Sequence, residues 1–281
     1  MSPMLNYLYA LFLSVTLAGV GTVDSYADNI CQTENIQQYD SKKKGLALKV
    51  RKDDPPTLVQ VAEQMNVRWY YNWSLHPYDE LKGKIPFFPM IWGRKAFEEF
   101  EHSREKYSLI LFLNEPDGLT QSNISVDEAL KMYPVVRKHA ELVVSPATVN
   151  ATEPWMREFE SKVALVGEQP DFVAVHWYGG PNATRLLEFL EEVHKLYGKP
   201  IWITEFAVAD WEAKRTGGPN RFTQDQIAKF MKKIIPALED LTYVKRYAWF
   251  TYRKESIQGS TSALFEPDGK LNKLGRLYSC Y

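Results

Sequence analysis

The chain has 281 residues, of which 45% are hydrophobic, and its formal net charge is −1. This length allows one large domain or two small ones. The longest basic run is Lys42-Lys43-Lys44, so neither a nucleic-acid partner nor an anionic membrane surface is indicated. The chain contains no short-period repeat and no low-complexity tract.

The first 27 residues have the pattern of a secretory signal. Residues 5–23 are mostly apolar and carry no charged side chain, and Ser25-Tyr26-Ala27 follows with small residues at the cleavage position. We expect removal of residues 1–27 and a mature domain over 28–281, located outside the cell or in the cell wall. An uncleaved membrane anchor is the alternative, because no Lys or Arg precedes the apolar run.

The rest of the chain shows no second membrane signal. No other segment approaches the roughly 20 apolar residues of a transmembrane helix. The end of the chain, 277–281, has no hydrophobic tail of the kind that directs a GPI anchor. We therefore expect no membrane contact once the signal is cleaved.

Cysteines and sequons also fit an oxidising compartment. Cys31 and Cys280 lie near the two ends of the mature chain, and we expect them to form a disulfide; two unpaired thiols are the alternative. Asn72 is expected to be buried and unmodified, while the other sequons fall in polar, loop-like stretches. The four Asn-x-Ser/Thr sequons are at Asn72, Asn123, Asn150 and Asn182.

Short apolar strands alternate with helical stretches along the chain. Strands are predicted at 45–49, 68–73, 85–92, 109–115, 142–145, 171–178, 201–205 and 243–252. Helices are predicted at 56–65, 95–106, 126–139, 154–166, 183–197, 223–241 and 271–277. This alternation predicts an α/β fold, a single-domain (β/α)₈ TIM barrel. A doubly wound open sheet is the alternative, but the Gly-rich phosphate turn that usually follows its first strand is absent.

Two of these strands end in a glutamate. Residues 109–113 are all apolar, as in a strand buried on both faces, and the run stops at Asn114-Glu115-Pro116. Residues 201–204 form a second short strand that ends at Glu205. Since chemistry in a barrel takes place at the carboxyl ends of the strands, we expect Glu115 and Glu205 to form one pair.

The residue types around this pair indicate work on a sugar. Two carboxylates with aromatic neighbours serve acid/base and nucleophilic catalysis at a glycosidic bond. The five histidines are scattered and no Cys/His cluster exists, so a zinc site is not expected, nor is any other metal or cofactor. The lack of a Gly-x-Ser-x-Gly elbow argues against a serine esterase.

Four motifs give the chain a resemblance to a known family. They are Trp-Tyr-Tyr-Asn-Trp at 69–73, Leu-Asn-Glu-Pro at 113–116, His-Trp-Tyr at 176–178 and Trp-Ile-Thr-Glu-Phe-Ala at 202–207. They resemble clan A retaining glycoside hydrolases, and more narrowly the family 128 endo-β-1,3-glucanases. That "glycosyl hydrolase catalytic core" group includes fungal alkali-sensitive linkage proteins. The resemblance runs from about Gly45 to Trp249.

The resemblance implies a function and a separate catalytic role for each of the two glutamates. Glu115 would be the general acid/base and Glu205 the nucleophile of a secreted retaining endo-β-1,3-glucanase that acts on β-1,3-glucan. Asn114 would hydrogen-bond the sugar 2-hydroxyl and Tyr178 would hold Glu205. Retention requires carboxyl groups only about 5 Å apart.

Further residues are expected in the binding cleft. Side-chain alternation places His176 with Tyr178 toward the lumen, although a structural histidine is the alternative. Trp249 is expected as a floor under the sugar at the cleavage point. Trp73 and Trp92 are expected to line outer subsites, because apolar sugar faces stack on aromatic rings. Asn72 and Trp177, inside two of the motifs, complete the predicted binding residues.

Several expectations concern packing rather than binding. Trp202 alternates away from Glu205 and is expected to pack against helices, whereas Trp69 and Tyr71 are left open between core and cleft. Asp117 is expected to cap a turn.

Three other functions stay open on the sequence. They are hydrolysis of another β-glycan, transglycosylation, and non-catalytic binding of wall glucan. The mature protein is expected to be a monomer.

Overall fold

The protein is described here by a computed structural model over residues 31–33, 36–40, 42–103 and 105–281; the predicted signal lies outside these residues. Its strands are β1 (Lys44–Ala47), β2 (Trp69–Tyr71), β3 (Met90–Ile91), β4 (Tyr107–Phe112), β5 (Ala140–Val144), β6 (Val173–Gly179), β7 (Ile201–Val208) and β8 (Val244–Phe250). They form two parallel sheets with the orders β2-β1-β8-β7-β6 and β3-β4-β5.

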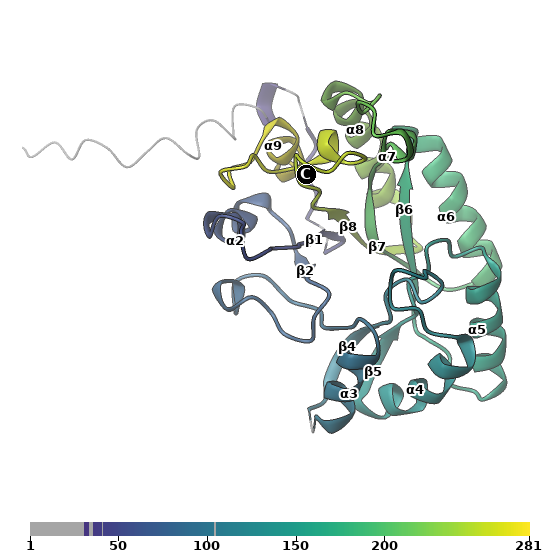
Figure 1. The fold of residues 1–281 in the computed structure, drawn as a ribbon. Helices are drawn as coiled ribbons and strands as arrows, with labels where there is room; N and C mark the ends of the chain where they lie inside the picture. The colour runs from purple at the N-terminus through teal and green to yellow at the C-terminus, as the bar shows by residue number, and fades with distance from the viewer. Residues whose placement is uncertain (1–30, 34–35, 41, 104) are drawn as a thin grey trace, which may run out of the picture.

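Helices follow the strands and cover their outer side, as Figure 1 shows for α4, α5 and α6 outside β4 to β7. Side-chain caps fix where several helices begin: Ser125, Asn182 and Thr223 each accept a backbone N–H of the first turn. The short α7 after β7 was not predicted. The helices are α2 (Thr57–Ala62), α3 (Arg94–His102), α4 (Val126–His139), α5 (Pro154–Leu165), α6 (Ala183–Tyr197), α7 (Trp211–Thr216), α8 (Gln224–Asp240) and α9 (Lys273–Ser279).

The strand order is that of a (β/α)₈ barrel divided into two arcs. At the seams the described residues form only isolated parallel bridges, between Tyr70 and Phe87 and between Val144 and Phe172. Strand β3 is short because Pro86 and Pro89, inside the predicted strand 85–92, cannot donate to a ladder. The fold is therefore α/β and TIM-barrel-like; a continuous closed ladder is not present among the described residues, and full closure stays a prediction.

The buried hydrophobic side chains form two clusters, an inner one enclosed by the strands and an outer one between the strands and the helices. The inner cluster includes Trp69 and Tyr71, so both rings belong to the core, while the Tyr71 hydroxyl also reaches Glu205. Trp69 lies directly over Gly45, where an added Cβ would come within 2.2 Å of the indole. Only glycine at position 45 leaves room for the Trp69 indole, so β1 and β2 can pair as neighbouring strands with this ring packed over Gly45.

The prediction for Trp202 was wrong. Its ring lies in the inner cluster against Trp69, Phe88 and Phe172 rather than against the helices. The β6–β7 register runs from Val175↔Ile203 to His176↔Glu205, which leaves one extra residue, Thr204, in β7. This bulge breaks the two-residue alternation, so Trp202 and Glu205 both face inward.

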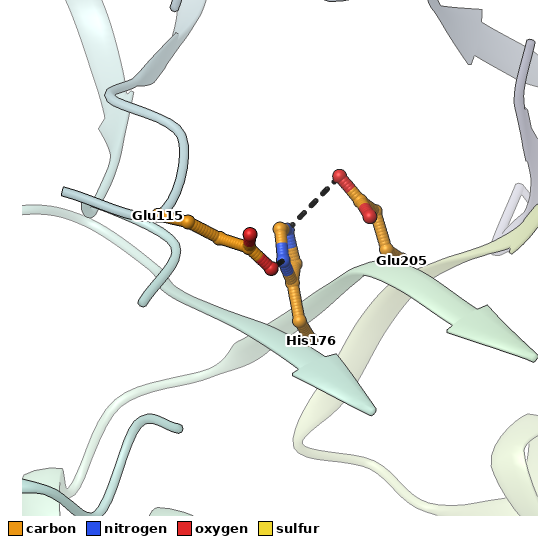
Figure 2. A group of neighbouring side chains, drawn as sticks. All are labelled: Glu115, His176 and Glu205. Atoms are coloured by element: carbon orange, nitrogen blue, oxygen red, sulfur yellow. Dashed lines mark hydrogen bonds and ion pairs between the residues drawn. The ribbon is translucent and has the colours of Figure 1, made fainter. Parts of the chain in front are cut away.

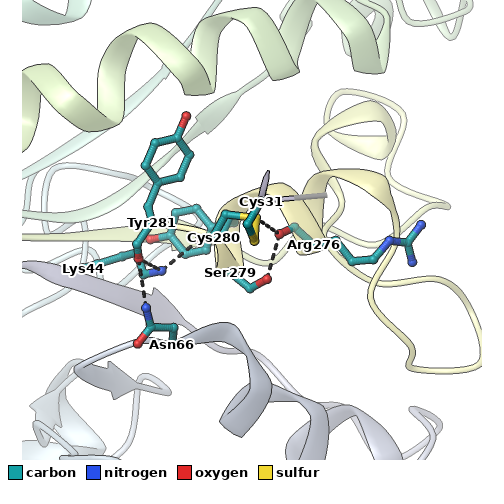
Figure 3. The surroundings of a disulfide bond; sticks show 8 residues. Cys31, Lys44, Asn66, Arg276, Ser279, Cys280 and Tyr281 are labelled. Carbon is teal, nitrogen blue, oxygen red and sulfur yellow. Dashed lines mark hydrogen bonds between the residues drawn. A yellow bond between two sulfur atoms is a disulfide. The ribbon is translucent and has the colours of Figure 1, made fainter. Parts of the chain in front are cut away.

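The predicted disulfide is confirmed. Cys31 and Cys280 are bonded, with a Cα–Cα distance of 5.3 Å, and no cysteine within the described chain is free. Figure 3 shows the bond beside α9 and the last residues, and Figure 1 shows the purple N-terminal segment against the yellow α9. None of the helices in the described part of the chain is long and apolar enough to cross a membrane.

Candidate active site

Glu115 is held just beyond the end of β4 by an unusual backbone. Leu113 and Glu115 have φ of 58° and 41°, in the left-handed region that non-glycine residues rarely adopt. Backbone bonds fix this path: the Leu113 N–H donates to Ile91 O at 2.8 Å and the Glu115 N–H to Ala147 O at 2.6 Å. Strand β3 and the segment that follows β5 therefore set the backbone position of Glu115.

Glu205 follows the extra residue of the β7 bulge, and its carboxylate accepts hydrogen bonds from three neutral donors. Oε1 accepts from the Tyr71 hydroxyl at 3.1 Å and from Trp73 Nε1 at 2.8 Å, while Oε2 accepts from the Tyr178 hydroxyl. Burial and the charge of Glu205 raise the pKa of both Tyr71 and Tyr178 well above the ordinary value. Both phenols therefore remain protonated donors, and Glu205 is fixed in orientation.

His176 lies between the two glutamates, as Figure 2 shows. Its Nδ1 is 2.9 Å from Glu115 Oε1 and its Nε2 is 3.3 Å from Glu205 Oε1. One ligand atom from each of the three residues lies within 4.8 Å of the others. Burial alone lowers the pKa of His176, but the charges of Glu205 and Glu115 and the hydrogen bond to Glu115 outweigh it, so the pKa is raised.

The pair opens into a cleft of about 510 Å³ at the carboxyl ends of the strands. Aromatic rings, amides and one lysine form its walls, a combination suited to a sugar. The lining residues are Lys49, Trp73, Trp92, Asn114, Glu115, Gln121, Val149, Tyr178, Glu205, Trp211, Phe250, Tyr252 and Gln258.

Most of the predicted site residues meet in this cleft. Trp73, Trp92, Asn114 and Tyr178 line it together with both glutamates. Asn114 is only 4% exposed, and its Oδ1 has no hydrogen-bond partner among the described residues. A buried amide oxygen without a partner is placed to accept a hydroxyl of a bound molecule.

The prediction for Trp249 was wrong. Its indole is fully buried on the outer side of β8, against Phe206, Phe230 and Tyr278, so no ligand can stack on it. Ala248 faces the inner cluster, so regular alternation turns Trp249 toward the helices. Phe250 is the aromatic residue of β8 that lines the cleft.

Trp177 and Asn72 lie outside the cleft lining. Trp177 faces outward, stacked on Phe230 with ring centroids 5.6 Å apart, and lines a neighbouring groove of about 640 Å³. Asn72 is half-buried rather than buried, and its amide bonds His76 O and the Ser74 N–H within its own loop. Neither residue contacts the glutamate pair directly in this structure.

Sequence reasoning missed part of the wall. Tyr71 lies two residues before Trp73, so alternation alone would have placed both on the same side, toward Glu205. Asp117 accepts the N–H of Val149, 32 residues further along the chain, so it joins two loops, which is a different contact from the expected cap of its own turn. The further lining residues that were not predicted are Lys49, Gln121, Val149, Trp211, Phe250, Tyr252 and Gln258.

The same cluster has the composition of a metal site. Glu115, His176 and Glu205 offer three ligand atoms at a spacing that a cation could bridge. However, both oxygens of Glu205 already accept hydrogen bonds from the Tyr and Trp donors, and Nδ1 of His176 is bonded to Glu115. The residues fit a hydrogen-bonded triad better than a metal centre, and the expected absence of a metal stays a prediction.

Two glutamates that face each other in an aromatic cleft, above parallel strands, define a site of the glycoside hydrolase class. A family model described as "Glycosyl hydrolase catalytic core" matches residues 45–278. The chain belongs to this family, and its relatives place it with the GH128 type.

Solved structures and one curated protein are similar to the chain. A GH128 subgroup I endo-β-1,3-glucanase from Amycolatopsis mediterranei, a glutamate-to-glutamine variant in complex with laminarihexaose, has a TM-score of 0.71 and 28% identity, covering 85% of this chain and 99% of that chain. Alkali-sensitive linkage protein 1 of Schizosaccharomyces pombe (strain 972 / ATCC 24843) is 27% identical over 225 residues, 75% of this chain and 40% of that protein. This chain therefore spans about two fifths of the length of that relative.

A third similarity concerns the fold alone. A GH128 subgroup VII oligosaccharide-binding protein from Trichoderma gamsii has a TM-score of 0.70 at 21% identity, covering 87% of this chain and 96% of that chain. The fold thus occurs both in glucanases and in a protein described as binding oligosaccharides.

Proposed function

We propose that this protein is a secreted, retaining endo-β-1,3-glucanase. The observation that carries the proposal is the Glu115–His176–Glu205 cluster at the base of the cleft, with its three ligand atoms within 4.8 Å of one another. Retaining glycosidases have carboxyl groups about 5 Å apart, whereas inverting enzymes need about 6.5–9.5 Å to admit a water molecule. The short separation supports retention.

In the first step Glu205 acts as the nucleophile. One of its oxygens bonds to the anomeric carbon while the bond from that carbon to the glycosidic oxygen breaks, and Glu115 gives its proton to the departing oxygen. The donors Tyr71, Trp73 and Tyr178 hold the Glu205 carboxylate in a single orientation for the attack. The product of this step is a glycosyl ester on Glu205.

In the second step water cleaves the ester. Glu115, now a carboxylate, takes a proton from water as the water oxygen bonds to the anomeric carbon and Glu205 leaves. His176, bonded to Glu115 at 2.9 Å, orients that carboxylate in both steps. The sugar keeps its original anomeric configuration because it is displaced twice.

The proposed substrate is supported by relatives and by the cleft. The A. mediterranei enzymes were solved with laminarihexaose, laminaripentaose and laminaritriose, which are β-1,3-linked glucose chains. In this chain Asn114 offers a free amide oxygen beside Glu115, placed for a sugar hydroxyl. Trp73 and Trp92 offer ring faces on the same wall.

Binding without cleavage is the competing function, because a GH128 relative is described as an oligosaccharide-binding protein. The complete pair in this chain favours hydrolysis. A buried carboxylate with three donors is a costly arrangement that a module for neutral sugars does not require.

The test is hydrolysis of a panel of β-1,3-, β-1,4- and β-1,6-linked glucans by the wild type, Glu115→Gln and Glu205→Gln. We expect soluble oligosaccharides from laminarin, β-anomers as first products by NMR, and losses of about 10³-fold or more in both variants. Circular dichroism checks that the variants are folded. Full activity of both variants, or binding of laminarin by the wild type with no product, overturns the proposal; cleavage of another linkage alone, or chain lengthening, overturns the β-1,3-hydrolase assignment.

A further inference from the structure

Trp211 is an exposed aromatic residue at the edge of the catalytic cleft that the proposed mechanism does not use. It is the first residue of α7, its side chain lines the cleft, and 51% of the residue is exposed. Other large rings of the protein are mostly buried in the two clusters. An indole left in water beside a binding cleft is a candidate contact for a ligand.

The indole is fixed rather than free to rotate. Its Nε1 donates to the carbonyl oxygen of Tyr178 at 2.9 Å. Its ring also meets the Tyr178 ring edge-on, with centroids 6.3 Å apart and an interplanar angle of 85°. Tyr178 holds Glu205, so Trp211 has a defined position relative to the nucleophile.

A buried acid holds the segment that carries Trp211. Asp210 is fully buried and accepts the N–H groups of Glu212, Ala213 and Arg221, and the Arg221 guanidinium as well. The Arg221 hydrogen bond, which outweighs burial, and the backbone N–H groups together hold the pKa of Asp210 well below its usual range. Asp210 therefore stays charged and keeps the turn closed at all ordinary pH values.

The segment is also joined to the loop after β8. The Asp210 N–H donates to Gln258 O at 2.8 Å, and Asn220 Nδ2 donates to Ile257 O and Gln258 O. Gln258 lines the cleft itself. Two loops that form this wall are thus one connected unit, and Trp211 belongs to a rigid surface.

We infer that Trp211 is a glucan-binding platform, an outer subsite on which a glucosyl ring of the bound chain stacks. The inference rests on the proposed function and extends it to chain-length preference. Trp73 and Trp92 follow β2 and β3, whereas Trp211 follows β7, so aromatic faces lie on two walls of one cleft. A glucan bound across the glutamate pair reaches Trp211 only when the chain extends beyond the glucosyl units on either side of the cleaved bond.

The platform also explains why the indole is anchored. A ring that is already fixed loses little side-chain entropy when a sugar stacks on it, so the contact gives more binding free energy. A purely structural role predicts otherwise: the Tyr178 carbonyl bond would be the only function of the indole, and its exposed face would be incidental.

The experiment compares Trp211→Ala, Trp211→Phe and a control, Leu165→Ala. Leu165 is an apolar residue at the end of α5 with 86% exposure, outside the cleft lining. For each variant kcat and KM are measured on laminaritriose and laminarihexaose. Binding of laminarin is measured by affinity electrophoresis in the Glu205→Gln background, and thermal unfolding checks the fold.

We expect Trp211→Ala to raise KM for laminarihexaose about tenfold, which corresponds to about 1.4 kcal/mol, with a much smaller change in kcat. The effect on laminaritriose should be smaller than on laminarihexaose. Trp211→Phe keeps a smaller stacking face and loses the five-membered ring with its N–H, so it should retain more of the affinity than Trp211→Ala. Leu165→Ala should match the wild type.

Several outcomes overturn the inference. Equal losses on both oligosaccharides, a loss in kcat alone, or a Trp211→Phe variant as impaired as Trp211→Ala each assign the indole a structural role. An unchanged KM for laminarihexaose in Trp211→Ala refutes the platform outright. If the wild type neither binds nor cleaves laminarin, the proposed function fails, which is a separate result from a wild type that is active while its Trp211 variants are normal.

Discussion

Removal of one hydroxyl tests whether the donors to Glu205 serve catalysis. Among the described residues Oε2 of Glu205 accepts a hydrogen bond from Tyr178, whereas Oε1 is shared by Tyr71 and Trp73. Tyr178→Phe keeps the ring and its contacts with Trp211, Phe250 and Tyr252. The change therefore removes one bond to one oxygen.

The magnitude follows from the charge on the acceptor. A hydrogen bond to an ionised group contributes about 1.5–3 kcal/mol. If that contribution is lost from the transition state, kcat/KM falls about 10- to 150-fold. Tyr71→Phe is the matched comparison, because Trp73 remains on the same oxygen at 2.8 Å. Its effect should be clearly smaller.

The assay is release of reducing sugar from laminarin over a range of substrate concentrations, with thermal unfolding as the check on folding. A Tyr178→Phe enzyme within about twofold of the wild type would mean that the hydroxyl does not act in the transition state, since about 0.4 kcal/mol is below the contribution of any such bond. A Tyr71→Phe effect equal to or larger than that of Tyr178→Phe would contradict the assignment of the two oxygens.

Three further predictions concern stability. Replacing both Cys31 and Cys280 by serine removes a cross-link with a sequence separation of 249, and should lower the free energy of unfolding by up to about 5 kcal/mol, measured by denaturant titration; an unchanged midpoint would contradict this. The pKa of His176 is raised above 6.5, so the stabilisation from its charge is complete below about pH 6.5 and is lost as the pH rises through the raised value. The difference in unfolding free energy between wild type and His176→Gln should therefore shrink as the pH rises above about 6.5, and a difference that grows would refute the sign. The buried hydroxyl of Tyr133 has no hydrogen-bond partner in the described part of the chain, so Tyr133→Phe should leave stability unchanged or raise it by about 1 kcal/mol, seen as an equal or higher Tm.

The sequence predicted the site well where a residue's position relative to a strand end decides where its side chain lies. Glu115 and Glu205 follow apolar runs, and the carboxyl ends of parallel strands meet at one edge, so their meeting in one cleft was predictable. The Cys31–Cys280 bond was predictable for another reason, because the chain has only two cysteines and therefore only one possible pairing within it.

The two failures have different causes. Trp202 was placed by counting alternate residues from Glu205, and the bulge in β7 reverses that count. Trp249 was expected in the cleft without regard to its face of β8, and regular alternation from Ala248 turns it toward the helices.

Missed residues such as Trp211, at the start of the unpredicted α7, lie beyond the strands, where side-chain direction depends on long-range contacts. The bonds from Asp210 to Arg221 and to the loop after β8 have no periodic pattern in the sequence.

The extra residue in β7 links strand register to the hydrogen bonds of the site. One residue of a strand spans about 3.3 Å, which is longer than any of the hydrogen bonds that hold Glu205. Loss of Thr204 would therefore carry the Glu205 carboxylate out of reach of Tyr71, Trp73 and Tyr178. The bulge and the three donors are thus mutually dependent, and neither can change alone without disconnecting this carboxylate.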